Sequence, residues 1–342
     1  MIPLAHVFKE LFAERTRISL TILAIAWGTA SITTMLALGE GLRVTFGRSG
    51  KGMGEGILIV WPGQTSKAYG GLPEGHPTRL SSEDLSALRR AVPEIGAMSG
   101  EQRHWLTMRA GEEFRSGRVH GVEPDYGTMR NIFVEPGGRF IDPIDMQQRR
   151  RVCVIGNEVA AELFEAGVDP VGTRIEIDAR PFIIIGVMQP KFQNSTYGGP
   201  DWDGTWIPLT TFEAMRNDRV LDNLVVKPHE SSQMERMKIR MREVIAGRQG
   251  TDPTDEEIVN YWDTLEQQTI ALNIMVGLQI VLGVIGGLTL IVAGVGIANV
   301  MYVSVTNATR DIGIRMAVGA RGYQILGQYT LEALLATAIG GA

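Results

Sequence analysis

The strongest constraint in this sequence is a long apolar stretch near its C-terminal end. No Asp, Glu, Lys or Arg lies between Glu266 and Arg310. A run of eighteen or more uncharged apolar residues predicts a membrane-spanning helix, because only a helix satisfies its own backbone hydrogen bonds in hydrocarbon. At about 1.5 Å per residue, a helix over residues 271–305 would reach roughly 50 Å against a hydrocarbon core of roughly 30 Å. A buried helix of a soluble protein is the alternative, but such helices rarely extend so far without a charge. We therefore expect a membrane helix over residues 271–305, tilted or partly outside the bilayer.

A second apolar stretch lies near the N-terminus. Residues 18–39 contain no charged residue and have about the length of one membrane span. A cleaved signal peptide is the competing interpretation, but its apolar region is usually only about 7–15 residues long. We therefore expect a retained transmembrane helix over residues 18–39. Residues 1–17 mix basic residues with apolar residues at helical spacing, which predicts an amphipathic helix on the cytoplasmic membrane surface.

Basic residues predict the orientation of both spans. They precede the first span at Lys9, Arg15 and Arg17, and they follow the second at Arg310, Arg315 and Arg321. Short segments rich in Lys and Arg remain in the cytoplasm, whereas long domains are translocated largely regardless of their charge. We therefore expect a cytoplasmic N-terminus, and a large domain outside the cytoplasm between the two spans.

The middle of the chain, residues 40–254, has an ordinary soluble composition and is long enough to bury its own core. The net charge of −5 gives no reason to expect nucleic acid as a partner. The single cysteine, Cys153, excludes an internal disulfide framework and lies in an apolar strand pattern, where we expect it to be a small buried residue.

Periodicity along this middle region predicts a mixed α/β domain. We expect strands at residues 56–61, 105–109, 118–122, 150–156, 174–178, 181–187 and 221–226, the fifth and sixth forming a hairpin around Ala179-Arg180. We expect helices at residues 81–92, 158–164 and 231–247, with the methionines of the last facing the core. Residues 255–270 predict an amphipathic stalk helix that continues into the membrane helix.

No catalytic or metal-binding set is convincing. Gly50-Lys51 has Thr45 where a Walker A motif requires its first glycine. The histidines lack metal-ligand spacing, and Asp201-Trp202-Asp203-Gly204 lacks the distal ligands of a calcium loop, which favours a polar turn. Neither span contains a charged residue, which argues against a proton or ion pathway and for a machine that is powered elsewhere. We expect no catalytic residue and no resident metal or cofactor in this chain.

Residues 309–321, TRDIGIRMAVGAR, resemble the signature of FtsX/MacB-type permeases of ABC transporters, and Ile325-Leu326 and Leu331-Glu332-Ala333 match its continuation. The outer domain is similar to the extracytoplasmic domain of MacB-like permeases. The matching motifs are Val152-x-Val154-Ile155-Gly156, Ala160-x-x-Leu163-Phe164, Asp169-Pro170-Val171-Gly172 and Phe182-x-x-Ile185-Gly186-Val187.

The resemblance implies a bacterial inner-membrane protein with four membrane helices and a large outer domain between the first and the second. It also implies a homodimer or heterodimer of permeases, a partner ABC-type ATPase that binds the ATP, and room for a periplasmic adaptor and an outer-membrane channel. The chain carries no ATPase domain, and the apolar helix of residues 323–342 stops before it completes a span, so we expect a partner and a truncation in the third membrane helix.

Residues 306–322 form a short cytoplasmic segment between two helices. From composition alone, a coupling helix seated in a groove of an ATPase and an ordinary loop with basic anchors are equally favoured. The family motif favours coupling to the ATPase. The residues expected to make this contact are Arg310, Asp311, Ile312, Gly313, Ile314, Arg315, Met316, Ala317, Gly319, Ala320 and Arg321.

The sequence therefore predicts the permease subunit of a MacB-like ABC transporter. Such a subunit transmits the ATP-driven motion of its partner to the outer domain and exports an antibiotic, peptide, lipoprotein or similar substrate. The alternative is an FtsX-like regulatory module that controls an extracytoplasmic partner such as a cell-wall hydrolase. An anchored enzyme is a third interpretation, but no residue cluster supports it.

Overall fold

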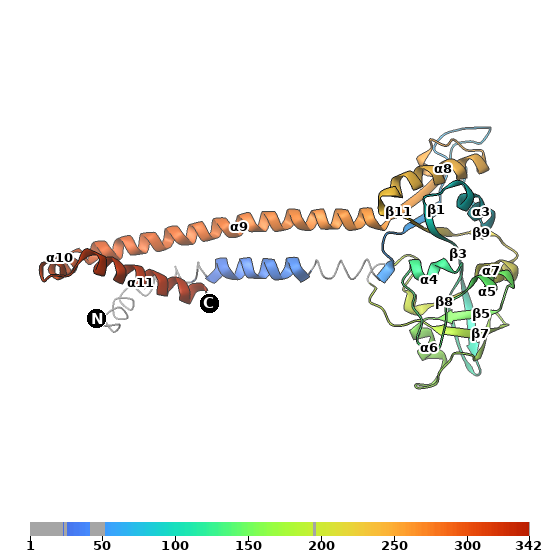
Figure 1. The fold of residues 1–342 in the computed structure, drawn as a ribbon, viewed down its shortest axis with the longest axis horizontal. Coiled ribbons are helices and arrows are strands. Elements are labelled where there is room, and N and C mark those ends of the chain that lie inside the picture. Colours follow the sequence, from blue (N-terminus) through green and yellow to red (C-terminus); the bar gives the residue numbers. More distant parts are fainter. Residues whose placement is uncertain (1–22, 24–25, 42–51, 194–195, 342) are drawn as a thin grey trace. The chain divides into compact units, whose positions relative to one another are not determined.

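The structure is a computed structural model that describes residues 23, 26–41, 52–193 and 196–341. The chain divides into a helical unit, Met1–Val44 with Ile270–Ala342, and a domain unit, Thr45–Thr269 (Figure 1). The surface helix expected over residues 1–17 lies outside the described residues, as does the beginning of the span expected over residues 18–39. Residues 26–41 are helical.

The domain unit is a mixed α/β fold. Its strands are β1 (Leu58–Pro62), β2 (Leu80–Ser81), β3 (Ile95–Ala110), β4 (Glu113–Val122), β5 (Val152–Ile155), β6 (Arg174–Ile177), β7 (Arg180–Val187), β8 (Gly204–Pro208), β9 (Val220–Leu221), β10 (Asn223–Pro228) and β11 (Val259–Asp263). Its helices are α3 (Ser82–Ala91), α4 (Asp125–Met129), α5 (Pro143–Gln147), α6 (Asn157–Leu163), α7 (Leu209–Arg216) and α8 (Met234–Gln249), with short 3₁₀ turns at Asp201–Asp203, Ser231–Gln233 and Glu256–Ile258.

Nine strands form one sheet in the order β11-β1-β10-β3-β4-β8-β5-β7-β6. The long strand β3 pairs with β10 and β4, and its far end also pairs with β6 through Met108 and Ile177. This last pairing closes the strands from β3 to β6 into a ring. Most neighbours are antiparallel, but β4 with β8 and β5 with β7 are parallel.

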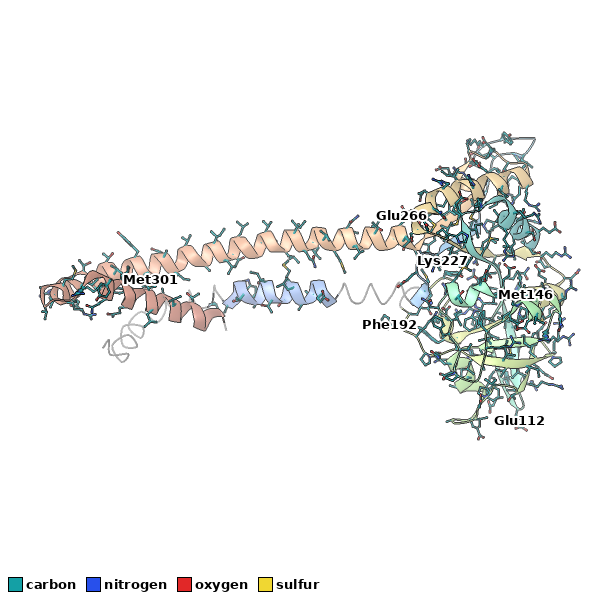
Figure 2. All side chains as sticks on the ribbon, in the orientation of Figure 1. Glu112, Met146, Phe192, Lys227, Glu266 and Met301 are labelled. Carbon is teal, nitrogen blue, oxygen red and sulfur yellow. The ribbon has the colours of Figure 1, made fainter. Side chains whose placement is uncertain are left out.

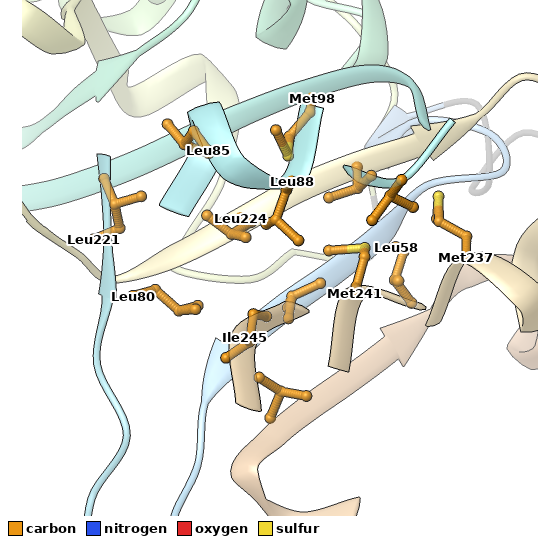
Figure 3. Packing of buried hydrophobic residues seen from close by; sticks show 14 of the residues in the cluster. Leu58, Leu80, Leu85, Leu88, Met98, Leu221, Leu224, Met237, Met241 and Ile245 are labelled. Carbon is orange, nitrogen blue, oxygen red and sulfur yellow. The ribbon is translucent and has the colours of Figure 1, made fainter. Parts of the chain in front are cut away.

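Alternation along the strands buries both faces of the open part of the sheet. Leu58 and Leu224 point to one face, where the apolar sides of α3 and α8 cover them (Figure 3). Ile59 and Val225 point to the other face and pack in a second cluster that includes Tyr126 of α4. Because successive strand residues face opposite sides of the sheet, one strand contributes side chains to both clusters. A third cluster contains Cys153 and belongs to the closed ring.

Several sequence-based expectations are confirmed here. Met234, Met237 and Met241 of α8 are buried in the core, and Cys153 is fully buried. α3 begins after Ser81, whose backbone N–H and hydroxyl both donate to Asp84 at 2.8 Å. The hairpin of β6 and β7 forms, although its turn lies at Asp178-Ala179, both with positive φ, one residue earlier than expected.

The stalk helix expected over residues 255–270 is wrong for its first half. Residues Glu256–Ile258 form a 3₁₀ turn, and Val259–Asp263 form β11, which pairs with β1 along its whole length. The sequence VNYWD alternates and is rich in β-branched and aromatic residues, and the open edge of β1 provides a partner. The helix begins only at Thr264.

The helical unit contains residues 26–41 and most of α9 (Thr264–Asn307), followed by α10 (Thr309–Ala317) and α11 (Gly322–Gly341). Within the described part of the chain, α9 is the one helix long and apolar enough to cross a membrane. Many of its large apolar side chains are exposed, among them Ile274, Ile280 and Ile291. Figure 2 shows side chains projecting from α9 along its length. A helix inside a soluble core would bury these side chains, so this alternative does not describe α9.

Several hydroxyl side chains on these helices donate hydrogen bonds to backbone carbonyls of their own helix. Thr289 and Thr306 of α9 donate to the carbonyl oxygens of Ile285 and Tyr302, four residues earlier, at 2.9 and 2.7 Å. Ser31 of the residue-26–41 helix donates in the same way to Trp27 at 2.7 Å. Such a bond gives each of these three hydroxyl hydrogens an acceptor that an apolar environment would not provide.

Small residues allow the helix of residues 26–41 to pack antiparallel against α9. Gly28 lies beside Thr289, and Gly286 lies beside Ile32, where an added Cβ would come within 2.7 Å of the Ile32 side chain. Small residues at such positions allow two helix backbones to approach closely. By contrast, a Cβ at Gly287 would meet no atom within 4 Å.

Candidate functional site

The segment expected to couple to an ATPase is the short helix α10 with the turn that follows it. A single residue, Ala308, separates the end of α9 from the start of α10. Ile314 and Met316 of α10, together with Val318 just beyond it, are exposed, Val318 with 85% of its surface accessible. Ile314 and Met316 are two positions apart and therefore lie on different sides of α10. Several exposed apolar side chains on so short a segment are a feature of protein interaction sites.

Two of the expected site residues, Gly319 and Ala320, form the C-terminal cap of α10. The amide of Ala320 donates to the Arg315 carbonyl at 2.9 Å, and the amide of Gly319 donates to the Met316 carbonyl at 3.1 Å. These two bonds form a Schellman cap, whose turning residue needs a positive φ. Gly319 has φ of 101°, a conformation that glycine adopts without steric cost. Gly319 and Ala320 therefore stop α10 and redirect the chain into α11.

The charged residues of the segment differ in their exposure to solvent. Arg310, Asp311 and Arg321 are exposed. Arg315 is half-buried, and its guanidinium donates to the buried Oε1 of Gln328 in α11 at 3.0 Å. Arg315 thus ties α10 to α11, a role that the sequence did not indicate.

The remaining residues of the segment differ in what they offer to a partner. Ile312 is half-buried, whereas Ala317 is exposed. A Cβ at Gly313 would meet no atom within 4 Å. Glycine inside a helix costs about 1 kcal/mol relative to alanine, and no contact within the described chain explains it. The open surface at Gly313 allows another backbone to approach α10 closely.

A second site is a buried polar network in the domain unit that sequence reasoning did not find. Its centre is the fully buried carboxylate of Glu101 on β3. Oε1 accepts from His120 at 2.7 Å and from Tyr126 at 3.1 Å, and Oε2 accepts from Tyr197 and Asn223, both at 2.8 Å. These four bonds use the acceptor capacity of a carboxylate in full.

A buried ion-pair cluster adjoins this network. Arg130 donates to Asp201 at 2.8 Å, and the ammonium of Lys191 lies 2.6 Å from the same carboxylate. The Arg130 guanidinium also stacks on the ring of Tyr197, 4.5 Å from its centroid. Burial alone would raise the pKa of Asp201, but the charges of Arg130 and Lys191 lower it.

The electrostatics assign a structural role to this network. Burial alone would raise the pKa of Glu101, but the hydrogen bond and charge of His120, with Arg103 and Asn223, lower it to about 2. Burial raises the pKa of Tyr126. Glu101 therefore remains an anion that joins β3, β4, β10, α4 and the loop before β8. Among the described residues, no group of three or more His, Cys, Asp or Glu side chains is placed to hold a metal ion.

Comparison with known proteins matches both parts of the chain. Residues 18–244 match the MacB-like periplasmic core domain, and residues 283–342 match the FtsX-like permease C-terminal family. The chain is 34% identical over 337 residues to the macrolide export ATP-binding/permease protein MacB of Azoarcus sp., covering 97% of this chain and 49% of that protein. The MacB of Rhodospirillum rubrum is 32% identical, with 97% and 50% covered. The chain thus spans about half the length of these relatives.

Solved structures support the same fold. The periplasmic region of MacB from Actinobacillus actinomycetemcomitans matches with a TM-score of 0.51 and 17% identity, covering 66% of this chain and 97% of that one. The extracellular domain of the ABC-type transporter YknZ from Gram-positive bacteria matches with a TM-score of 0.50 and 16% identity, covering 60% and 100%. These structures show the same domain fold, and the two family matches show that the chain belongs to the MacB-like permeases, which combine a MacB-like periplasmic core domain with an FtsX-like permease region.

Proposed function

We propose that this chain is the membrane component of an ABC exporter whose ATP-binding component docks on residues 310–321. Closure of the ATPase would push on α10, and α9 would carry the motion to the domain unit. Substrate would be moved on the periplasmic side and would not pass between these helices. The supporting observation is the exposed surface of Ile314, Met316 and Val318 beside the open backbone at Gly313.

The topology that fits this function places residues 306–322 and the N-terminus in the cytoplasm. The domain unit would lie in the periplasm of a bacterial cell, inserted between the first and second membrane helices. The basic residues Arg310 and Arg321 support this orientation through the positive-inside rule. We infer a permease dimer, with the ATPase as a further partner and a periplasmic adaptor and outer-membrane channel as additional ones.

The substrate class is proposed from the relatives. Two MacB proteins that match nearly the whole chain are named for macrolide export. A macrolide or another bulky amphipathic compound is therefore the substrate we propose, ahead of regulation of a cell-wall hydrolase. The gene neighbourhood distinguishes these two functions, because an adaptor gene accompanies export and a hydrolase gene accompanies regulation.

Retention of an ABC ATPase on the tagged chain tests the docking surface. The chain is purified from detergent-solubilised membranes of its native cell, and bound ATPase is measured by vanadate-sensitive ATP hydrolysis. We expect Ile314→Asp to lower retention at least tenfold, because a desolvated apolar anchor contributes about 2 kcal/mol or more. Phe114→Asp is the matched control, since Phe114 is an exposed apolar residue of β4 in the domain unit. Equal retention by wild type and Ile314→Asp would show that α10 does not dock the ATPase.

A further inference from the structure

The junction between β11 and α9 has no linker. β11 ends at Asp263 and α9 begins at the next residue, Thr264. A helix that leaves a domain through a loop can pivot, whereas here the first turn of the helix continues a paired strand. Asp263 itself pairs with Leu58 of β1 in the ladder. The orientation of the first turn of α9 is thus set by the sheet.

Thr264 adds a set of hydrogen bonds to one residue of the neighbouring segment. Its hydroxyl accepts from the Ile57 amide at 3.1 Å and donates to the Ile57 carbonyl at 2.9 Å. The Thr264 amide donates to the same carbonyl at 3.2 Å. Both residues are buried, so water does not compete for these bonds. Ile57 immediately precedes β1, the strand that β11 pairs with.

Asp263 and Lys238 fix the same turn to α8. Oδ1 of Asp263 accepts from the amides of Leu265 and Glu266 at 2.9 and 3.3 Å, which is an N-cap. Its other oxygen, Oδ2, lies 2.8 Å from the ammonium of Lys238, a residue of α8. The main-chain carbonyl of Lys238 in turn accepts from the Tyr261 hydroxyl at 2.9 Å. Burial alone would lower the pKa of Lys238, but its bonds to Asp263 and Glu235 raise it.

We propose that Thr264, Asp263 and Lys238 form a clamp that makes the first residues of α9, Thr264–Thr269, move as one body with β1, β11 and α8. The clamp residues are positioning residues, because they act through the helix turn that they hold. The inference rests on the proposed function, in which α9 carries motion to the domain unit. It adds the residues at which that motion enters the domain. Without the clamp, the first turn of α9 would pivot at the Asp263–Thr264 bond.

Spin-label distance measurements on the full chain in lipid nanodiscs test the clamp. Cys153 is the only cysteine and is buried, so labels attach to cysteines introduced at exposed Ile239 of α8 and exposed Gln267 of α9, both within the domain unit. We expect a narrow distance distribution in the wild-type background. Thr264→Val and Lys238→Met should each widen the distance distribution at least twofold. Lys238→Arg, which keeps the positive charge, should leave the distribution as narrow as in the wild type. Asp263→Asn keeps the N-cap but removes the charge, and should widen the distribution as Lys238→Met does.

Thr269→Val is the matched control. The Thr269 hydroxyl donates to the Leu265 carbonyl within α9 at 2.9 Å, so its loss removes a bond that the clamp does not use. Distributions as narrow in Thr264→Val and Lys238→Met as in the wild type would overturn the clamp. If Thr264→Val lowers the melting temperature, Lys238→Met and Asp263→Asn decide the question. The proposed function can fail independently of the clamp. In that case the wild-type chain would retain no ATPase, but its spin-label distance distribution would still be narrow.

Discussion

Replacement of Glu101 by glutamine tests whether the buried network holds the domain unit together through its charge. The substitution keeps the shape of the side chain and removes its negative charge. The new amide faces the four groups that now donate to the carboxylate: His120, Tyr126, Tyr197 and Asn223. The amide of Asn223 can turn, since its Oδ1 has no hydrogen-bond partner and would accept from the new NH₂ group. The main loss is therefore that of charge-assisted bonds.

The pKa of Glu101 supplies the magnitude. It is lowered from 4.5 to about 2, and each tenfold change in proton affinity is worth about 1.4 kcal/mol. The charged form therefore contributes about 3 kcal/mol to the free energy of unfolding at neutral pH. A carboxyl whose pKa is lowered by folding stabilises the fold above its unfolded-state pKa. This contribution is lost as the pH falls from 4.5 towards 2. Glu101→Gln should therefore be about 3 kcal/mol less stable than the wild type at pH 7, with the difference vanishing at low pH.

Thermal unfolding of the full chain in detergent measures this difference. For a domain of this size, about 3 kcal/mol corresponds to a fall of roughly 6–12 °C in melting temperature. Glu112→Gln is the control, because Glu112 is an exposed glutamate in the turn between β3 and β4 and should leave the melting temperature unchanged. A gap of less than about 1 kcal/mol at pH 7, or one that persists unchanged at pH 3, would refute the role assigned to the charge.

Two further predictions concern other parts of the chain. Cys153 is fully buried, and burial raises the pKa of its thiol, so a maleimide should label it only after unfolding; rapid labelling of the folded chain would contradict this. Gly286→Val should weaken the packing of residues 26–41 on α9, because the new side chain would overlap Ile32, whereas Gly287→Val enters open space and should have no effect. Disulfide cross-linking between cysteines introduced at positions 28 and 289 measures that packing, and equal yields in the two variants would show that it does not depend on Gly286.

Local patterns predicted the elements that depend on neighbouring residues. The core-facing methionines of α8, the capped start of α3 and the hairpin of β6 and β7 follow from spacing that a single segment contains. α10 was recognisable for the same reason, because its motif is contiguous. The structure adds that Gly319 serves as the helix cap and that Arg315 bonds to Gln328, thirteen residues later.

The Glu101 network could not have been predicted in this way. Its partners stand at positions 120, 126, 197 and 223 and meet only when β4, α4 and β10 assemble around β3. A lone glutamate in a strand indicates an exposed face, since charged residues are rarely buried without a partner. The information that overrides this expectation lies in tertiary contacts, which a periodicity pattern does not contain.

The start of α9 is different, because the sequence contained a signal for it. Asp263 followed by Glu266 has the spacing of a helix N-terminus, with a capping residue and an acidic residue three positions later. The amphipathic helix expected over residues 255–270 does not take this spacing into account. The structure shows why the cap is the better indicator. Periodicity describes only which face of a segment is buried. The alternating sequence VNYWD can bury the same side chains as a strand. A helix start, by contrast, needs acceptors for its first free amides, and Asp263 provides one. Because strand and helix meet at Asp263 with no residue between them, the residue that caps α9 also belongs to the sheet, and this is the physical basis of the clamp.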